Sequence, residues 1–249
     1  MPMPRSGLIA ALAVAVGAVG AVRAEDLPVD LELVLAVDIS GSIDPWEASQ
    51  QREGYIAAMA DEAVVHAIRS NFHQRIAVAY IEWGGADHQR TVLPWTVIDD
   101  RASAEAFAGA LAEASAVRAM YTSISHAIDY AVPMFEGNGY AGERQVIDVS
   151  GDGPNNRGRP LADARADALA KGITINGLPI LNDRTQPWDS PTPVEMQLDK
   201  YYAEHVIGGP GAFIVIADDF RAFRDAILSK LIREIAGRDG PTVVRVAAR

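Results

Sequence analysis

Short side chains that carry oxygen atoms gather in three segments of this 249-residue sequence. They are Asp38-Ile39-Ser40-Gly41-Ser42, Tyr121-Thr122-Ser123 and Ser150-Gly151-Asp152-Gly153. The three segments offer carboxylate and hydroxyl oxygens, and they contain no imidazole or thiolate. Such hard oxygen ligands, with few charges, suit Mg²⁺ or Mn²⁺ that keeps some of its waters, rather than zinc or copper. The residue types therefore predict a divalent-cation site if the fold brings the segments together, whereas each segment alone is equally explained as a turn or a helix cap.

The elements that would position these segments alternate along the chain. Apolar runs predict strands at 31–37, 75–83, 90–97, 144–149, 172–181 and, as the last strand, 212–216. Helical patterns start at Asp44, with a core-facing stripe as far as Ala67, and recur at 103–115, 123–135, 160–171, 194–206 and 218–237. This alternation predicts one doubly wound α/β domain with a mostly parallel central sheet and helices on both faces. Pro94 predicts that 90–97 is an edge strand, paired antiparallel with 75–83.

In a doubly wound sheet, the functional site lies beyond the carboxyl ends of the strands, where the winding reverses. All three oxygen-rich segments follow a predicted strand or precede a predicted helix on this side, so we expect them to converge. Asp148 lies in the strand before the third segment, on the same face as Ser150 by alternation. Its carboxylate could orient the metal ligands, or it could accept hydrogen bonds from loop amides.

Together the three segments resemble a von Willebrand factor type A (vWA) domain with its metal-ion-dependent adhesion site, in particular an exported bacterial subgroup of that superfamily. The resemblance covers about residues 31–236. The family's Asp-x-Ser-x-Ser motif corresponds to Asp38, Ser40 and Ser42, its Thr to Thr122, and its second Asp to Asp152. The resemblance implies that the three hydroxyls bind the cation directly and that the two carboxylates bind it directly or through waters. It also implies a protein partner that supplies a carboxylate to the open coordination position.

The residues leave alternatives to this binding role open. Asn155, Asn156 and Arg157 follow the Asp152 turn and are candidates for contact with a partner, or they form an ordinary polar turn. A metal-dependent phosphatase-like hydrolase with Asp38 as nucleophile is one alternative function, although Ser40 stands where such enzymes use a second carboxylate. A structural scaffold without a metal is the other. We expect no catalytic residues.

Residues 1–24 have the layout of a secretory signal peptide. Arg5 precedes an apolar run over 7–22, and Val22-Arg23-Ala24 carries suitable residues for cleavage after Ala24. An uncleaved membrane anchor is the alternative. We expect a single domain over 25–249, with its core at about 31–237, exported to the periplasm or secreted, with no stable membrane span after cleavage.

Charge and cysteine content narrow the possible functions. The net charge of −11 has the wrong sign for binding nucleic acid by bulk charge. The absence of cysteine excludes disulfides, thiolate zinc sites and cysteine nucleophiles. These limits make nucleic acid an unlikely partner and exclude cysteine chemistry, and they are compatible with an acidic protein that is exported.

Overall fold

The computed structural model of the chain describes residues 25–181, 197–237, 240 and 242–247. In this part of the chain, a seven-stranded sheet has the order β4-β3-β2-β6-β7-β8-β9. Its strands are β2 (Leu31–Asp38), β3 (Ile76–Trp83), β4 (Gln89–Ile98), β6 (Gln145–Gly151), β7 (Thr174–Pro179), β8 (Ile214–Ala217) and β9 (Val243–Val246). All neighbouring strands are parallel except β3 and β4, which pair antiparallel. The predicted sheet with one antiparallel edge strand is confirmed.

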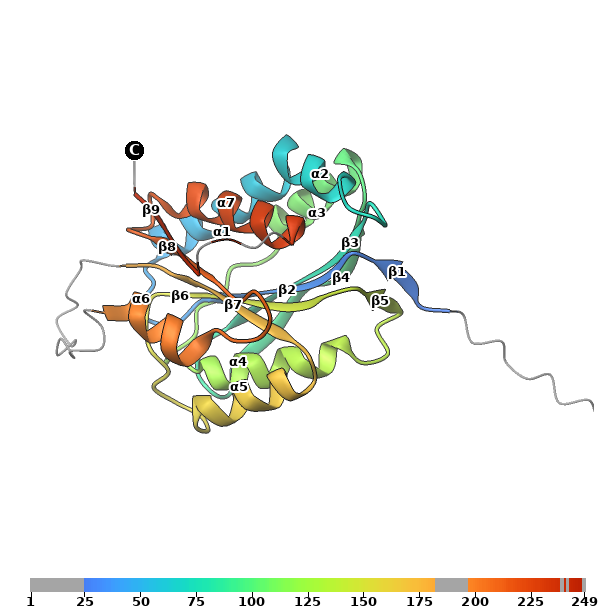
Figure 1. Cartoon of the computed structure of the whole chain (residues 1–249). Helices are drawn as coiled ribbons and strands as arrows, with labels where there is room; N and C mark the ends of the chain where they lie inside the picture. Colours follow the sequence, from blue (N-terminus) through green and yellow to red (C-terminus); the bar gives the residue numbers. More distant parts are fainter. Residues whose placement is uncertain (1–24, 182–196, 238–239, 241, 248–249) are drawn as a thin grey trace, which may run out of the picture.

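Helices cover both faces of the sheet (Figure 1). One face carries α1 (Pro45–Met59), α2 (Glu62–Arg69), α3 (Arg101–Glu113) and α7 (Phe223–Ala236). The other carries α4 (Ile124–Ala131), α5 (Leu161–Ala170) and α6 (Leu198–Tyr201). A 3₁₀ turn, Val132–Phe135, extends α4, and a π-helical turn, Tyr202–Val206, extends α6.

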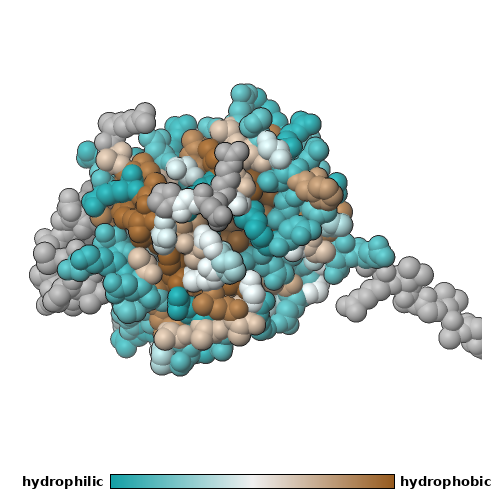
Figure 2. All heavy atoms as spheres, in the orientation of Figure 1, coloured by the Kyte–Doolittle hydropathy of each residue, from teal (hydrophilic) through white to brown (hydrophobic). Residues whose placement is uncertain are grey.

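The core lies in two apolar layers, one on each side of the sheet. All eight residues of β2 are buried, because its side chains alternate between the two layers. Leu33 and Leu35 pack under α1 and α7, while Val34 and Ala36 pack under α4 and α5. A central strand covered on both faces is therefore mostly apolar along its whole length, rather than alternating between apolar and polar residues. In Figure 2 the apolar residues gather in the middle of the visible face, and hydrophilic residues surround them.

The start of α1 follows from its sequence. The Asp44 side chain accepts hydrogen bonds from the backbone N–H groups of Trp46 and Glu47, at 2.8 and 2.9 Å. The Glu47 carboxylate accepts from the Asp44 N–H at 2.8 Å, which completes a capping box. The expected single helical stripe as far as Ala67 is wrong, because α1 ends at Met59 and Asp61 caps a separate helix, α2.

Three short strands were not predicted. β9 follows α7, so the strand at 212–216 is not the last one. β1 (Leu27–Val29) pairs in parallel with β5 (Tyr140–Gly142) in a small second sheet. The predicted signal peptide lies outside the described residues, as does the start of the helix predicted over 194–206, residues 194–196. No helix in the described part of the chain combines the length and the apolar character needed to cross a membrane.

Candidate metal centre

The two carboxylates of the predicted site stand at the carboxyl ends of adjacent central strands. From β2 the chain winds to β3 on one side, and β6 then begins the other half of the sheet. Asp38 is the last residue of β2, and Asp152 directly follows the last residue of β6. Val37 pairs with Ser150, so both acidic residues stand at the same carboxyl edge. This is the switch point of the winding, where doubly wound sheets bind their ligands.

A chain of hydrogen bonds connects four of the predicted residues. The Ser40 N–H donates to Asp38 Oδ1 at 2.7 Å, and the Ser40 and Ser42 hydroxyls are 3.1 Å apart. The Ser42 hydroxyl donates to Asp152 Oδ1 at 2.7 Å. Thr122 lies beside them, since its Oγ1 would be 3.8 Å from a Cβ placed on Gly153, the residue after Asp152. The fold therefore brings all three oxygen-rich segments to one place.

Asp38 is the carboxylate of this cluster that burial affects most strongly. Its side chain is fully buried, and its Oδ2 has no hydrogen-bond partner among the described residues. Burial raises the pKa of Asp38 well above its usual value, and the nearby charge of Asp152 raises it further. Hydrogen bonds from Ser40 and from the Asp152 backbone oppose this shift only in part. A cation between the two carboxylates would remove the repulsion and give Asp38 Oδ2 a partner.

The kinds of donor atom in the cluster fit a hard cation. Within the part of the chain that the structure covers, no three His, Cys, Asp or Glu side chains gather in a way that could hold a metal. A cation here would therefore depend on two carboxylates, on hydroxyls and on water. Mg²⁺ and Mn²⁺ accept such a ligand set, whereas zinc prefers imidazole and thiolate.

Gly151 and Tyr202 complete the inner wall of the cluster. A Cβ on Gly151 would lie 2.8 Å from Asp38 Oδ2 and 2.8 Å from the Tyr202 hydroxyl, so no side chain fits there. Tyr202 is fully buried, and its hydroxyl has no partner in the described chain. Burial raises the pKa of Tyr202, as do the charges of Asp38 and Asp152. Tyr202 could not be identified from the sequence, because an aromatic residue in a predicted helix carries no signal that separates it from core packing.

The segment 155–157 holds the Thr122 loop in place. The Asn156 side chain accepts from the Thr122 N–H at 3.0 Å, and Asn155 accepts from the Ser125 N–H, in the first turn of α4, at 3.0 Å. The Arg157 guanidinium lies 4.4 Å from the centre of the Tyr121 ring. Contact of Asn155, Asn156 and Arg157 with a partner stays a prediction, and their bonds within the chain add a positioning role that the sequence did not reveal.

Asp148 neither orients the metal ligands nor accepts hydrogen bonds from loop amides, the two roles that the sequence suggested for it. Its carboxylate forms an ion pair with Lys230 Nζ of α7 at 2.6 Å, and Glu234 contacts the same ammonium group. All three side chains are buried. Burial and the charge of Glu234 raise the pKa of Asp148 to about 7, and Lys230 limits the rise. Asp148 therefore ties β6 to α7 instead of meeting the metal ligands or loop amides.

Solved structures confirm the fold expected from the sequence. The vWA protein from Catenulispora acidiphila is similar with a TM-score of 0.56 and 16% identity, over 83% of this chain and 43% of that one. Proximal thread matrix protein 1 (PTMP1) from the mussel byssus is similar with a TM-score of 0.60 and 13% identity, over 86% of this chain. This chain spans about half of PTMP1, 50% of its length. A second PTMP1 structure, with a TM-score of 0.57 and 14% identity over the same shares of both chains, has a zinc-occupied metal-ion-dependent adhesion site.

The pilus adhesin SpaC from Lactobacillus rhamnosus GG is also similar, with a TM-score of 0.58 and 15% identity over 85% of this chain and 31% of SpaC. These likenesses show a vWA-type fold. No curated protein matches the chain in sequence. The family described as "Protein of unknown function (DUF1194)" matches residues 28–239, which is most of the chain. This chain therefore belongs to the DUF1194 family.

Proposed function

We propose that this protein is an exported binding module that recognises a carboxylate on a partner protein through a bound Mg²⁺ or Mn²⁺. Ser40, Ser42 and Thr122 would bind the cation through their hydroxyls, and Asp38 and Asp152 directly or through waters. The observation that carries the proposal is the buried carboxylate of Asp38, whose Oδ2 has no partner in the described chain although Asp152 lies beside it. A carboxylate in this state is unfavourable unless a cation accompanies it.

Each part of the chain has a separate task in this mechanism. A cation held by these residues would supply a positive centre for a carboxylate of the partner. β2 and β6 hold the two acidic residues at one edge, and the hydrogen bonds of Ser40 and Ser42 keep the hydroxyls beside them. The two carboxylates and three hydroxyls would balance the charge of a divalent cation without filling its coordination shell, which would leave a position for the partner.

The similar proteins support recognition of a protein rather than catalysis. PTMP1 is a matrix protein of the mussel byssus, and SpaC is a pilus adhesin. One structure of PTMP1 has a metal in its adhesion site. The fold shared with them, together with the donor set of this chain, favours an adhesion-type module.

The test is the effect of a cation on thermal stability. A cation that binds only the folded chain stabilises it by about 2.7 kcal/mol when its free concentration is a hundred times its dissociation constant. For a domain of this size, that corresponds to a rise of roughly 5–10 °C in melting temperature. We expect Mg²⁺ or Mn²⁺ to produce such a rise in residues 25–249, and a chelator to reverse it.

Two matched double variants identify the site. Ser40→Ala with Ser42→Ala should remove the response to the cation and leave a folded protein. Ser49→Ala with Ser115→Ala, at two exposed serines outside the cluster, should keep the full response. An unchanged response in the Ser40/Ser42 variant would place the cation elsewhere and contradict the proposal.

The hydrolase alternative has its own test. The purified protein should not hydrolyse phosphate esters, carboxylic esters or peptides in any reaction that Asp38→Asn abolishes. Turnover that is lost in this variant would favour the phosphatase-like function over the binding module.

A further inference from the structure

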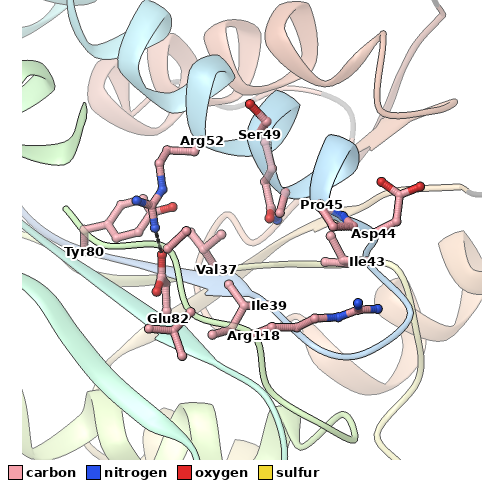
Figure 3. A pocket seen from close by; sticks show the side chains of 14 residues that line it. Val37, Ile39, Ile43, Asp44, Pro45, Ser49, Arg52, Tyr80, Glu82 and Arg118 are labelled. Carbon is pink, nitrogen blue, oxygen red and sulfur yellow. Dashed lines mark hydrogen bonds and ion pairs between the residues drawn. The ribbon is translucent and has the colours of Figure 1, made fainter. Parts of the chain in front are cut away.

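A pocket of about 310 Å³ opens beside the loop 39–43, which carries Ser40 and Ser42. The start of α1 forms one wall, the ends of β2 and β3 form the floor, and the segment 116–118 forms the opposite wall (Figure 3). Ser49, Val117 and Arg118 are exposed at its rim, so the pocket is open to solvent.

The same loop forms part of the pocket and part of the metal centre. Ile39 and Ile43 line the pocket, whereas Ser40 and Ser42, which lie between them in sequence, belong to the metal centre. Arg118 also lines the pocket, and its Nη2 donates to the carbonyl oxygen of Gly41 at 2.7 Å. A partner that reaches the metal at this edge therefore also passes the mouth of the pocket.

The lining favours an apolar group over a charged one. Val37, Ile39, Ile43 and other aliphatic side chains make most of the wall. The one buried charge at the floor, Glu82, is already neutralised by Arg52 and by Arg90, the latter at 2.6 Å. A charged occupant would find no free counter-charge in the interior, so it would lose its hydration without compensation.

Two polar side chains of the pocket also bear on which group could bind there. Gln51 lines the pocket and is only 2% exposed, and its side-chain Nε2 has no hydrogen-bond partner among the described residues. Arg118 at the rim is an exposed positive charge on a chain whose net charge is −11. This local charge favours the approach of an acidic segment at an edge that the chain as a whole would repel.

We infer that this pocket takes a large apolar side chain, such as Phe, Leu or Met, from the same partner segment whose carboxylate binds the cation. The inference rests on the proposed function and specifies its partner as an acidic residue with a large apolar residue close to it in sequence. The metal attracts any accessible carboxylate, whereas the pocket distinguishes one acidic segment from another. Burying such a side chain strengthens binding by about tenfold or more.

The test uses synthetic peptides with one Asp and one Phe in a Gly/Ser background. The Phe stands one to four positions before or after the Asp, and each peptide has a partner with Ala in place of Phe. Binding to residues 25–249 is measured by calorimetry with Mg²⁺ and with chelator. We expect at least one spacing at which the Phe peptide binds at least tenfold more tightly than its Ala partner, and only with Mg²⁺.

Variants of the pocket separate this inference from the metal site. Ala48→Trp fills the pocket from α1, and Val117→Asp puts a charge at its mouth. Both should bring the Phe peptide to within about twofold of its Ala partner, while the Mg²⁺ response of the melting temperature stays. Ala166→Trp, at an exposed position on the other face of the sheet, should change neither measurement.

The outcomes are distinguishable. If no Phe peptide gains over its Ala partner, or if the gain survives in Ala48→Trp, the inference is wrong, although an intact Mg²⁺ response still supports the metal site. If the parent protein responds neither to Mg²⁺ nor to any peptide, the proposed function fails, and the inference fails with it.

Discussion

At Gly151 the backbone of β6 approaches Asp38 so closely that a methyl group would overlap it. The overlap at 2.8 Å involves both the Asp38 carboxylate and the Tyr202 hydroxyl. Because both groups are buried, neither can move out of the way without disturbing the core. We expect Gly151→Ala to lower the free energy of unfolding by about 1–3 kcal/mol. We also expect it to abolish the Mg²⁺ response, measured by urea denaturation and thermal melting.

Gly109→Ala is the matched control. A Cβ at Gly109, in α3, would meet no atom within 4 Å. Alanine is also the better helix former there, so this variant should be about 0.5–1 kcal/mol more stable and should keep its Mg²⁺ response. A normal response in Gly151→Ala would show that the cation does not depend on the position of Asp38.

The residues of the site that could be predicted most directly are those of the Asp-x-Ser-x-Ser motif. Asp38, Ser40 and Ser42 lie within five consecutive residues, so their spacing is visible in the sequence. Asp152 could be added because two adjacent strands end at the same edge. Tyr202 could not, since it reaches Asp38 only through the folding of a segment more than 160 positions away, and aromatic residues occupy most cores.

At the scale of the elements, β6 and α7 are joined by the buried ion pair between Asp148 and Lys230. The folded pKa of Asp148, about 7, lies above its ordinary value of 3.8. The folded state therefore holds the proton more tightly, and the stability that this group contributes at low pH is lost as the pH rises through 7. Relative to Asp148→Asn, the parent protein should lose roughly 2–3 kcal/mol of unfolding free energy between pH 5 and pH 8.

Urea denaturation of both proteins at each pH measures this difference. Asp163→Asn, which changes an exposed carboxylate at the start of α5, is the control and should show no such trend against the parent. If the difference between the parent and Asp148→Asn is the same at pH 5 and pH 8, the carboxyl group does not titrate in the core as described.

The elements that could be predicted are those with a strong pattern. The strands β2, β3 and β6 are buried and mostly apolar, and the capping residues of α1 are visible in the sequence. β9 is only four residues long and none of its side chains is buried. A run this short, after the last predicted helix, does not distinguish a strand from a loop. The break between α1 and α2 was missed because apolar residues recur at helical spacing across it, although Asp61 was a possible cap.

For the molecule as a whole, the first prediction concerns its processing. Arg5 and the apolar run over 7–22 have the features of a cleaved leader. N-terminal sequencing of the exported protein should begin at Glu25 or within a residue or two of it. Recovery of the protein in the membrane fraction with its N-terminus intact would favour a retained anchor instead.

The position of β1 determines which end of the molecule faces away from an N-terminal attachment. β1 lies next to the amino end of β2, whereas the metal cluster lies at the carboxyl end, eight residues of extended strand away (Figure 1). At about 3.3 Å per residue, this separates the two poles by roughly 25 Å. An attachment before Glu25, whether natural or through an engineered tag, would leave the edge with Asp38 and Asp152 pointing away from the attachment. Immobilising the protein by its N-terminus should therefore not hinder a partner from reaching it.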